Sequence, residues 1–141
     1  MPALLRAPGT AIVLTVAIVA LTLTTAYIHF TLGGVLFTLN ALGYAALAAA
    51  ITAGSLPNPF ISRFSWLPRV GLAGFTAVTI GAYLVIGPYF SLGWIAKGVE
   101  VGILALLAID VVRVYGSPVG LVRAALATFA PSPQPGPMQT A

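Results

Sequence analysis

The amino-acid sequence predicts an all-α integral membrane protein in which four transmembrane helices form two antiparallel hairpins. Of the 141 residues, 60% are hydrophobic and 6% are charged, whereas a soluble domain carries about 25% charged residues. The mean hydropathy is +1.07, so the chain lacks the polar groups that would cover a water-facing surface. Lipid cannot satisfy the open edge of a sheet, and the spanning segments are therefore expected to be helical.

Four apolar runs each reach the length of about 20 residues that a membrane crossing needs. They cover residues 10–30, about 32–53, about 70–88 and about 92–115. Short turns join the first run to the second and the third to the fourth, so each pair is expected to pack as a hairpin. The first run is longer than the apolar core of a signal peptide, and we expect it to stay as a span. The whole chain then forms a single transmembrane domain.

Two further segments are expected to lie at the membrane surface as short helices. The first covers residues 59–67 and is flanked by prolines. The side chains expected to contact lipid headgroups there are Arg63, Trp66 and Arg69. The second covers residues 118–130, where Ser117 and Pro118 form a cap and first-turn pair. The Pro-rich tail, residues 131–141, is not expected to order on its own.

The distribution of basic residues predicts the orientation of the chain. With four spans, the side that holds both termini carries five of the six Lys and Arg residues, namely Arg6, Arg63, Arg69, Arg113 and Arg123. Only Lys97 falls on the other side. The positive-inside rule therefore places both termini in the cytoplasm, with the spans in a plasma or inner membrane.

A weak internal repeat relates the two expected hairpins. A shift of 60 residues aligns residues 29–33 with residues 89–93, and Phe, Leu and Gly match. The same shift places Asn40 on Glu100. A duplication about an axis along the membrane normal would explain the match. Chance similarity between short apolar segments is the other explanation.

Asn40, Lys97 and Glu100 form an expected polar cluster inside the membrane. By the helical rise, Glu100 lies about 12 Å below Leu92, near the middle of a hydrocarbon core about 30 Å thick. A charge at that depth costs about 2.5–3.5 kcal/mol, so Glu100 should be protonated, paired or turned inward. Lys97, three residues earlier, is the expected partner, and Asp110 with Arg113 repeats that spacing. The cluster is either a structural ion pair or a proton or cation site of a transporter.

Gly98 and Gly102 form a GxxxG pair, a common packing seam between membrane helices. Glu100 is expected on the opposite side of the same helix, because successive residues turn by about 100°. The last span therefore has a small-residue face and an ionic face. Either the bundle buries both faces, or one of them meets another protein chain.

His29 is the only histidine of the chain and lies near the end of the first span. An imidazole there can be an axial ligand to a haem or a chlorin. The alternative is an interfacial histidine bonded to the adjacent turn. No metal site is expected, since the chain has no cysteine and no second histidine.

The sequence therefore favours a small non-catalytic membrane protein. It lacks the dense basic face that binds nucleic acid, the cysteines of thiol or iron–sulfur chemistry, and any nucleophile triad or phosphate-binding loop. The first hypothesis is an accessory subunit that packs against other integral membrane subunits of a larger complex. The second is a small oligomeric transporter or channel that uses Glu100, Asn40 and Lys97. A weaker third is a subunit that holds a haem or chlorin through His29; otherwise no cofactor is expected.

Overall fold

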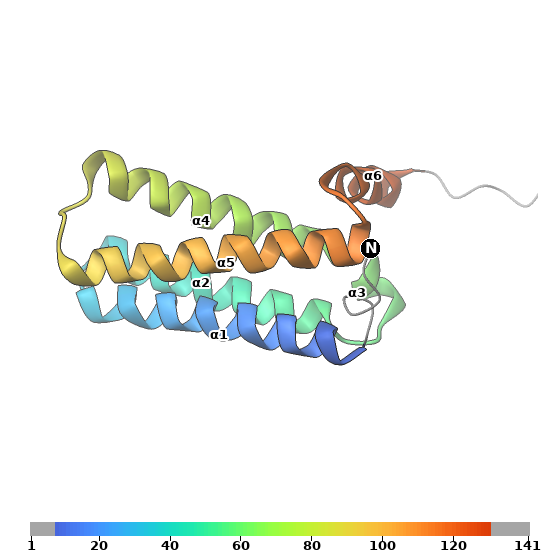
Figure 1. The fold of residues 1–141 in the computed structure, drawn as a ribbon, viewed down its shortest axis with the longest axis horizontal. Helices are drawn as coiled ribbons and strands as arrows, with labels where there is room; N and C mark the ends of the chain where they lie inside the picture. Colours follow the sequence, from blue (N-terminus) through green and yellow to red (C-terminus); the bar gives the residue numbers. More distant parts are fainter. Residues whose placement is uncertain (1–7, 131–141) are drawn as a thin grey trace, which may run out of the picture.

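The computed structural model describes residues 8–130, and within them it is entirely helical. Six helices follow one another (Figure 1): α1 (Pro8–Leu32), α2 (Val35–Gly54), α3 (Pro59–Arg63), α4 (Trp66–Ile86), α5 (Ser91–Tyr115) and α6 (Pro118–Phe129). Arg6, which contributes to the predicted orientation, lies outside the described residues. The Pro-rich tail, which is not expected to order on its own, lies outside them as well.

The four long helices form an antiparallel bundle in which α1, α2, α4 and α5 follow one another around a ring. The contacts of α1 with α2 and with α5 are the most extensive. Helix α4 contacts its neighbours α2 and α5 less extensively. The expected hairpins, α1 with α2 and α4 with α5, are both present. The central core consists of Ile18, Ala26, Tyr44, Ile51, Leu72, Ile103 and Leu107.

Three of the helices are long and apolar enough to cross a membrane. They are Gly9–Leu32, Val35–Gly54 and Trp66–Ile86. Many of their large apolar side chains point outward, as helices surrounded by lipid require. These properties indicate a multi-pass membrane protein. Helix α5 is not among the three, and it carries the charged residues Lys97, Glu100, Asp110 and Arg113.

The connection between α2 and α4 differs from the expected helix over residues 59–67. Asn58 caps α3 by accepting hydrogen bonds from the backbone N–H groups of Phe60 and Ile61, but α3 ends at Arg63. Helix α4 then begins at Trp66, before the expected start near residue 70. Pro68 does not prevent this, because the N–H groups of the first helical turn have no carbonyl partner within the helix.

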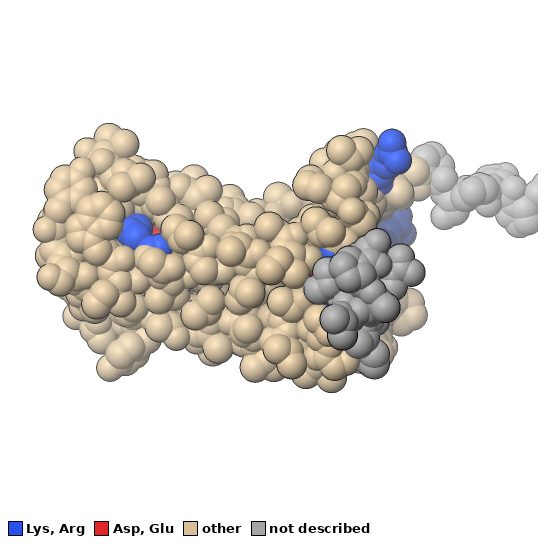
Figure 2. All heavy atoms as spheres, in the orientation of Figure 1, with Lys and Arg blue, Asp and Glu red and all other residues tan. Residues whose placement is uncertain are grey.

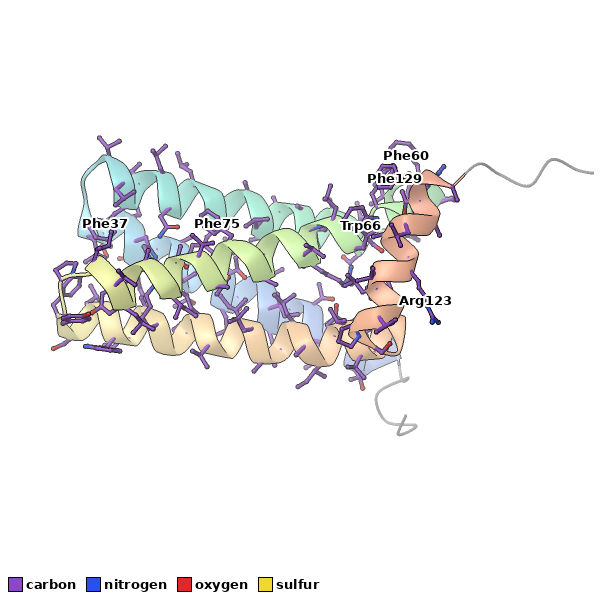
Figure 3. The ribbon with its side chains drawn as sticks, turned by 90° about the horizontal axis from the view of Figure 1, so that it is seen from above. Phe37, Phe60, Trp66, Phe75, Arg123 and Phe129 are labelled. Atoms are coloured by element: carbon purple, nitrogen blue, oxygen red, sulfur yellow. The ribbon has the colours of Figure 1, made fainter. Side chains whose placement is uncertain are left out.

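Helix α6 runs across the end of the bundle (Figure 3) and is held there by residues around α3. The Ser117 side chain caps it by accepting a hydrogen bond from Gly120 N at 3.0 Å. The indole Nε1 of Trp66 donates to Thr128 Oγ1 at 3.1 Å, and the guanidinium of Arg63 donates to the Thr128 carbonyl. Arg63 and Trp66, expected to contact lipid headgroups, thus bind α6 with their polar groups.

Candidate functional site

Glu100 lies on the inner face of α5 and is completely buried, with 0% of its surface exposed. Lys97, one turn earlier and 7% exposed, places Nζ 2.5 Å from Glu100 Oε2. The same Nζ donates to the carbonyl of Thr79 on α4 at 3.3 Å. The expected pair between Lys97 and Glu100 is therefore formed, and it is anchored to a second helix.

Hydroxyl groups from three other helices surround the Glu100 carboxylate. Thr25 of α1 donates to Oε1 at 3.3 Å, and Thr79 of α4 lies 3.3 Å from Oε2. The Tyr44 hydroxyl of α2 lies 2.7 Å from Thr79 Oγ1 and extends the network to the fourth helix of the bundle. One turn from Thr79, the buried Thr76 Oγ1 has no hydrogen-bond partner among the described residues. All four long helices thus contribute to one polar centre.

His29 completes this centre from α1 and is 3% exposed. Its Nδ1 lies 2.8 Å from the Thr25 carbonyl, which can only accept, so Nδ1 carries a hydrogen. Its Nε2 faces Glu100 Oε1 at 3.7 Å. If Nε2 carried no hydrogen, its lone pair would face the negative carboxylate and the contact would be repulsive. The contact becomes attractive when a proton resides on His29 or on Glu100. The contact is longer than a hydrogen bond, so the structure places the imidazole beside the carboxylate without a direct bond between them.

Both ring nitrogens of His29 are thus directed to protein groups rather than to lipid. A haem or chlorin ligated through Nε2 would have to displace the Glu100 carboxylate from its place. Among residues 8–130 no group of three or more histidine or acidic side chains could hold a metal ion. The site presents a histidine, an amine and a carboxylate, a set suited to binding and moving a proton.

A cavity of about 390 Å³ opens from this centre toward the α1–α2 and α4–α5 turns. Its polar lining consists of His29, Asn40, Thr79, Tyr83 and Lys97. Asn40 is half-buried on α2, and it lies on the cavity wall instead of joining the Lys97–Glu100 pair. Figure 2 shows blue and red atoms at a hollow in this part of the otherwise tan bundle wall.

The two glycines of the GxxxG pair do not pack together against one helix within the part of the chain that the structure describes. A Cβ at Gly102 would lie 3.3 Å from Leu21 of α1, whereas one at Gly98 would meet nothing within 4 Å. Closer helix approaches occur at two other glycines. A Cβ at Gly43 would lie 2.5 Å from the Phe75 ring, and one at Gly93 would lie 2.5 Å from the Tyr83 hydroxyl.

A second ionic centre surrounds Asp110, which is 2% exposed, at the end of the bundle near α6. Arg113 donates to Oδ1 from Nε at 3.0 Å and from a terminal nitrogen at 2.7 Å. Arg69 of α4 donates from Nε to Oδ2 at 2.8 Å and also bonds the Ser65 carbonyl. Arg69, expected to contact lipid headgroups, thus bridges α4 to α5, and it lies 5.9 Å from the Tyr115 ring centre.

The sequence predicts the Lys97–Glu100 pair, with Tyr44 or Tyr83 as further hydrogen-bond partners, but it does not place the threonines or His29 beside the pair. These residues and Tyr83 lie on two polar stripes with the same spacing, three and then four residues apart. On α1 the stripe is Thr22, Thr25 and His29, and on α4 it is Thr76, Thr79 and Tyr83. Residues with this spacing share one face of a helix, so the stripes mark the faces that these helices turn toward α5.

Comparison with known proteins finds no matching family model, no similar curated protein and no similar solved structure.

Proposed function

We propose that α5 is a fourth transmembrane span and that both termini lie on the cytoplasmic side of a plasma or inner membrane. At 25 residues, α5 is as long as α1. Both of its acidic groups are buried against cations. Its outer surface is apolar, with exposed Ile95, Val101, Ile109 and Val112. Figure 2 shows further blue atoms at the end that carries α3 and α6, which fits a cytoplasmic side.

The same orientation accounts for α6 as a helix in the headgroup region. Its exposed large side chains, Val119, Val122, Leu126 and Phe129, fall on one face at spacings of three and four residues. Arg123 is exposed at the edge of that stripe, as Figure 3 labels it at the end of the bundle. An apolar stripe beside a basic side chain suits a helix that lies in the membrane surface.

The topology can be tested with single cysteines, because the natural chain has none. Ser91→Cys and Ala127→Cys flank α5, and Ser55→Cys serves as a control on the proposed cytoplasmic side. In intact cells, a membrane-impermeant maleimide should label the Ser91→Cys protein alone. Labelling of Ser91→Cys and Ala127→Cys from the same side would show that α5 does not cross.

Within this membrane protein we propose a proton-linked transport function centred on Glu100. The main support for this proposal is the contact between His29 Nε2 and Glu100 Oε1 at 3.7 Å. The other ring nitrogen, Nδ1, already bonds the Thr25 carbonyl. The other titratable groups that face this pair are Lys97 from α5, Tyr44 from α2 and Tyr83 from α4. A purely structural ion pair would need only Lys97, whereas this carboxylate also faces a histidine, and we propose that the two groups share a proton.

The surrounding space supports the same function. The cavity reaches His29 and Lys97 from the turn side, while Ile18, Leu72, Ile103 and Leu107 fill the bundle toward the α6 end. The centre is thus reached from one direction and closed in the other. A carrier that exposes its site alternately to the two sides would have one such state.

Nitrogen-15 NMR tests the shared proton, since one labelled histidine gives one set of ring signals. In wild-type protein, the Nε2 signal of His29 should depend on the Glu100 carboxylate and shift in Glu100→Gln. Asp110→Asn, the matched change at the only other acid of the chain, should leave it unchanged. In dye-loaded liposomes under a membrane potential, Glu100→Gln should abolish a pH-dependent proton flux that Asp110→Asn retains. Identical ring signals and fluxes in wild type and Glu100→Gln would refute the proposal.

An accessory subunit is the second candidate, and one observation favours it. Gly98 lies on an exposed stretch of α5 where an added Cβ would meet nothing within 4 Å. A helix of another membrane protein could approach closely there. Purification at native expression levels would then recover larger membrane proteins in fixed ratio, and Gly98→Leu would release them. Recovery of the chain alone would reject this candidate.

A further inference from the structure

The cavity beside the Glu100 centre has an apolar rim that opens to lipid. The rim side chains on α2 and α4 are strongly exposed, and they are Leu36, Leu39, Val78 and Ile86. A molecule that reaches the cavity would therefore come from the membrane and leave an apolar tail among lipid chains. The volume of about 390 Å³ falls within the range of about 300–1,000 Å³ that small-molecule sites occupy.

The polar groups of the cavity have unused hydrogen-bonding capacity. The Asn40 side chain has no hydrogen-bond partner among residues 8–130, yet it lies on the cavity wall. Lys97 uses two of its three N–H donors, one on Glu100 and one on the Thr79 carbonyl. An acceptor oxygen on a ligand would therefore find donors on both α2 and α5.

The charge of the centre favours a neutral acceptor over an anion. The ammonium of Lys97 is already balanced by the Glu100 carboxylate at 2.5 Å. A second carboxylate, such as that of a fatty acid, would meet this negative charge next to Lys97, whose side chain lines the cavity. A carbonyl oxygen needs only the spare donors and brings no charge into the membrane interior.

The walls favour a flat ring as the body of the ligand. Phe37, Phe75, Tyr83 and Phe90 line the cavity from α2, α4 and the α4–α5 turn. Aromatic rings pack against a conjugated ring in stacked or edge-to-face arrangements. We infer that the cavity between α2, α4 and α5 binds a membrane-dissolved quinone, with a ring carbonyl at Asn40 and Lys97 and the tail between α2 and α4. This inference deepens the proposed function, since Lys97 and His29 belong to the same centre.

Binding can be measured through Trp94, which lies 5.4 Å from Tyr83, ring centre to ring centre. Quinones quench tryptophan fluorescence, and the other tryptophan, Trp66, lies at the α6 end. In detergent, a benzoquinone that carries a decyl chain should quench Trp94 saturably in the Trp66→Phe protein. In the Trp94→Phe protein it should quench Trp66 only in proportion to its concentration.

Three variants of the Trp66→Phe protein locate the site. Asn40→Leu should weaken binding about fivefold to tenfold, the effect of losing one hydrogen bond. Ala82→Phe fills the cavity wall and should abolish saturable quenching, whereas Ala77→Phe, an exposed alanine of the same helix outside the cavity, should retain it. Equal quenching in the Ala82→Phe and Ala77→Phe proteins would overturn the inference. Displacement of the quinone by an equal concentration of palmitate would also overturn it, in favour of an anionic lipid.

The two proposals fail separately. If quinone binding is absent while the His29 ring signals still depend on Glu100, the cavity inference is wrong and the proton site stands. If Ala82→Phe alone abolishes quenching while Glu100→Gln leaves proton flux unchanged, the ligand site stands without proton transport.

Discussion

Asp110→Ala should be one of the most damaging single substitutions in this chain. The Asp110 carboxylate accepts three hydrogen bonds from two guanidinium groups, at 2.7, 2.8 and 3.0 Å. Hydrogen bonds to charged groups contribute about 1.5–3 kcal/mol each, and breaking a buried ion pair costs about 3–5 kcal/mol. The side chains of Arg69 and Arg113 are 11% and 17% exposed, so the stranded guanidinium groups can regain some water or lipid phosphate. We therefore expect a loss of about 3 kcal/mol, the lower end of that range.

The assay is equilibrium unfolding in mixed micelles, in which a denaturing detergent is titrated and helix content is followed by circular dichroism. Val112→Ala is the matched control, because Val112 is a more exposed neighbour on the same helix and loses only apolar contact. Arg113→Met should cost less than Asp110→Ala, since Arg69 remains to balance the carboxylate. A loss for Asp110→Ala no larger than that of Val112→Ala would refute the assignment of Asp110 as a buried ionic link between α4 and α5.

Three further outcomes are expected. Glu100→Ala should destabilise the protein more than the double substitution Lys97→Ala/Glu100→Ala, because the single change strands a buried ammonium; equal losses in thermal melts would contradict this. Gly43→Ala should cost about 1–3 kcal/mol, because its Cβ would lie 2.5 Å from the Phe75 ring. The control Gly74→Ala, with open space around its Cβ, should be neutral or stabilising in the same unfolding assay. Thr128→Val removes the acceptor of the Trp66 indole and should speed amide hydrogen exchange across α6, whereas unchanged exchange would reject this anchor.

Much of the fold follows from hydropathy and turn chemistry. Apolar runs separated by Gly- and Pro-containing turns predict the long helices and their pairing, and Gly33 and Gly34 have the positive φ values, 70° and 81°, that a tight α1–α2 turn requires. The boundary between α3 and α4 is wrongly predicted when Pro68 is interpreted as a helix break. In the first turn of a helix, however, proline costs no hydrogen bond. The fourth crossing and the internal repeat stay predictions.

The ion pairs of the candidate site are predicted only along α5, since spacing within one helix is visible in a sequence and contact between helices is not. Asn40 of α2, expected in the same cluster, lies on the cavity wall instead. The Lys97–Glu100 and Asp110–Arg113 pairs are three residues apart and were found. Arg69 lies 41 residues from Asp110, so its partner depends on how α4 packs. For the same reason the sequence leaves His29 either as an axial ligand or as an interfacial histidine, whereas the structure buries it beside Glu100. Its four-residue spacing from Thr25 places both side chains on one face of α1.

Both acidic side chains of the chain reside on α5, which follows α1, α2 and α4 in the sequence. If α5 crosses the membrane as proposed, a charge near its centre, such as that of Glu100, opposes insertion by about 2.5–3.5 kcal/mol. The groups that neutralise or solvate the two acids from other helices, Thr25, His29, Arg69 and Thr79, all belong to segments synthesised earlier. Insertion of α5 should therefore depend on prior assembly of α1 and α4.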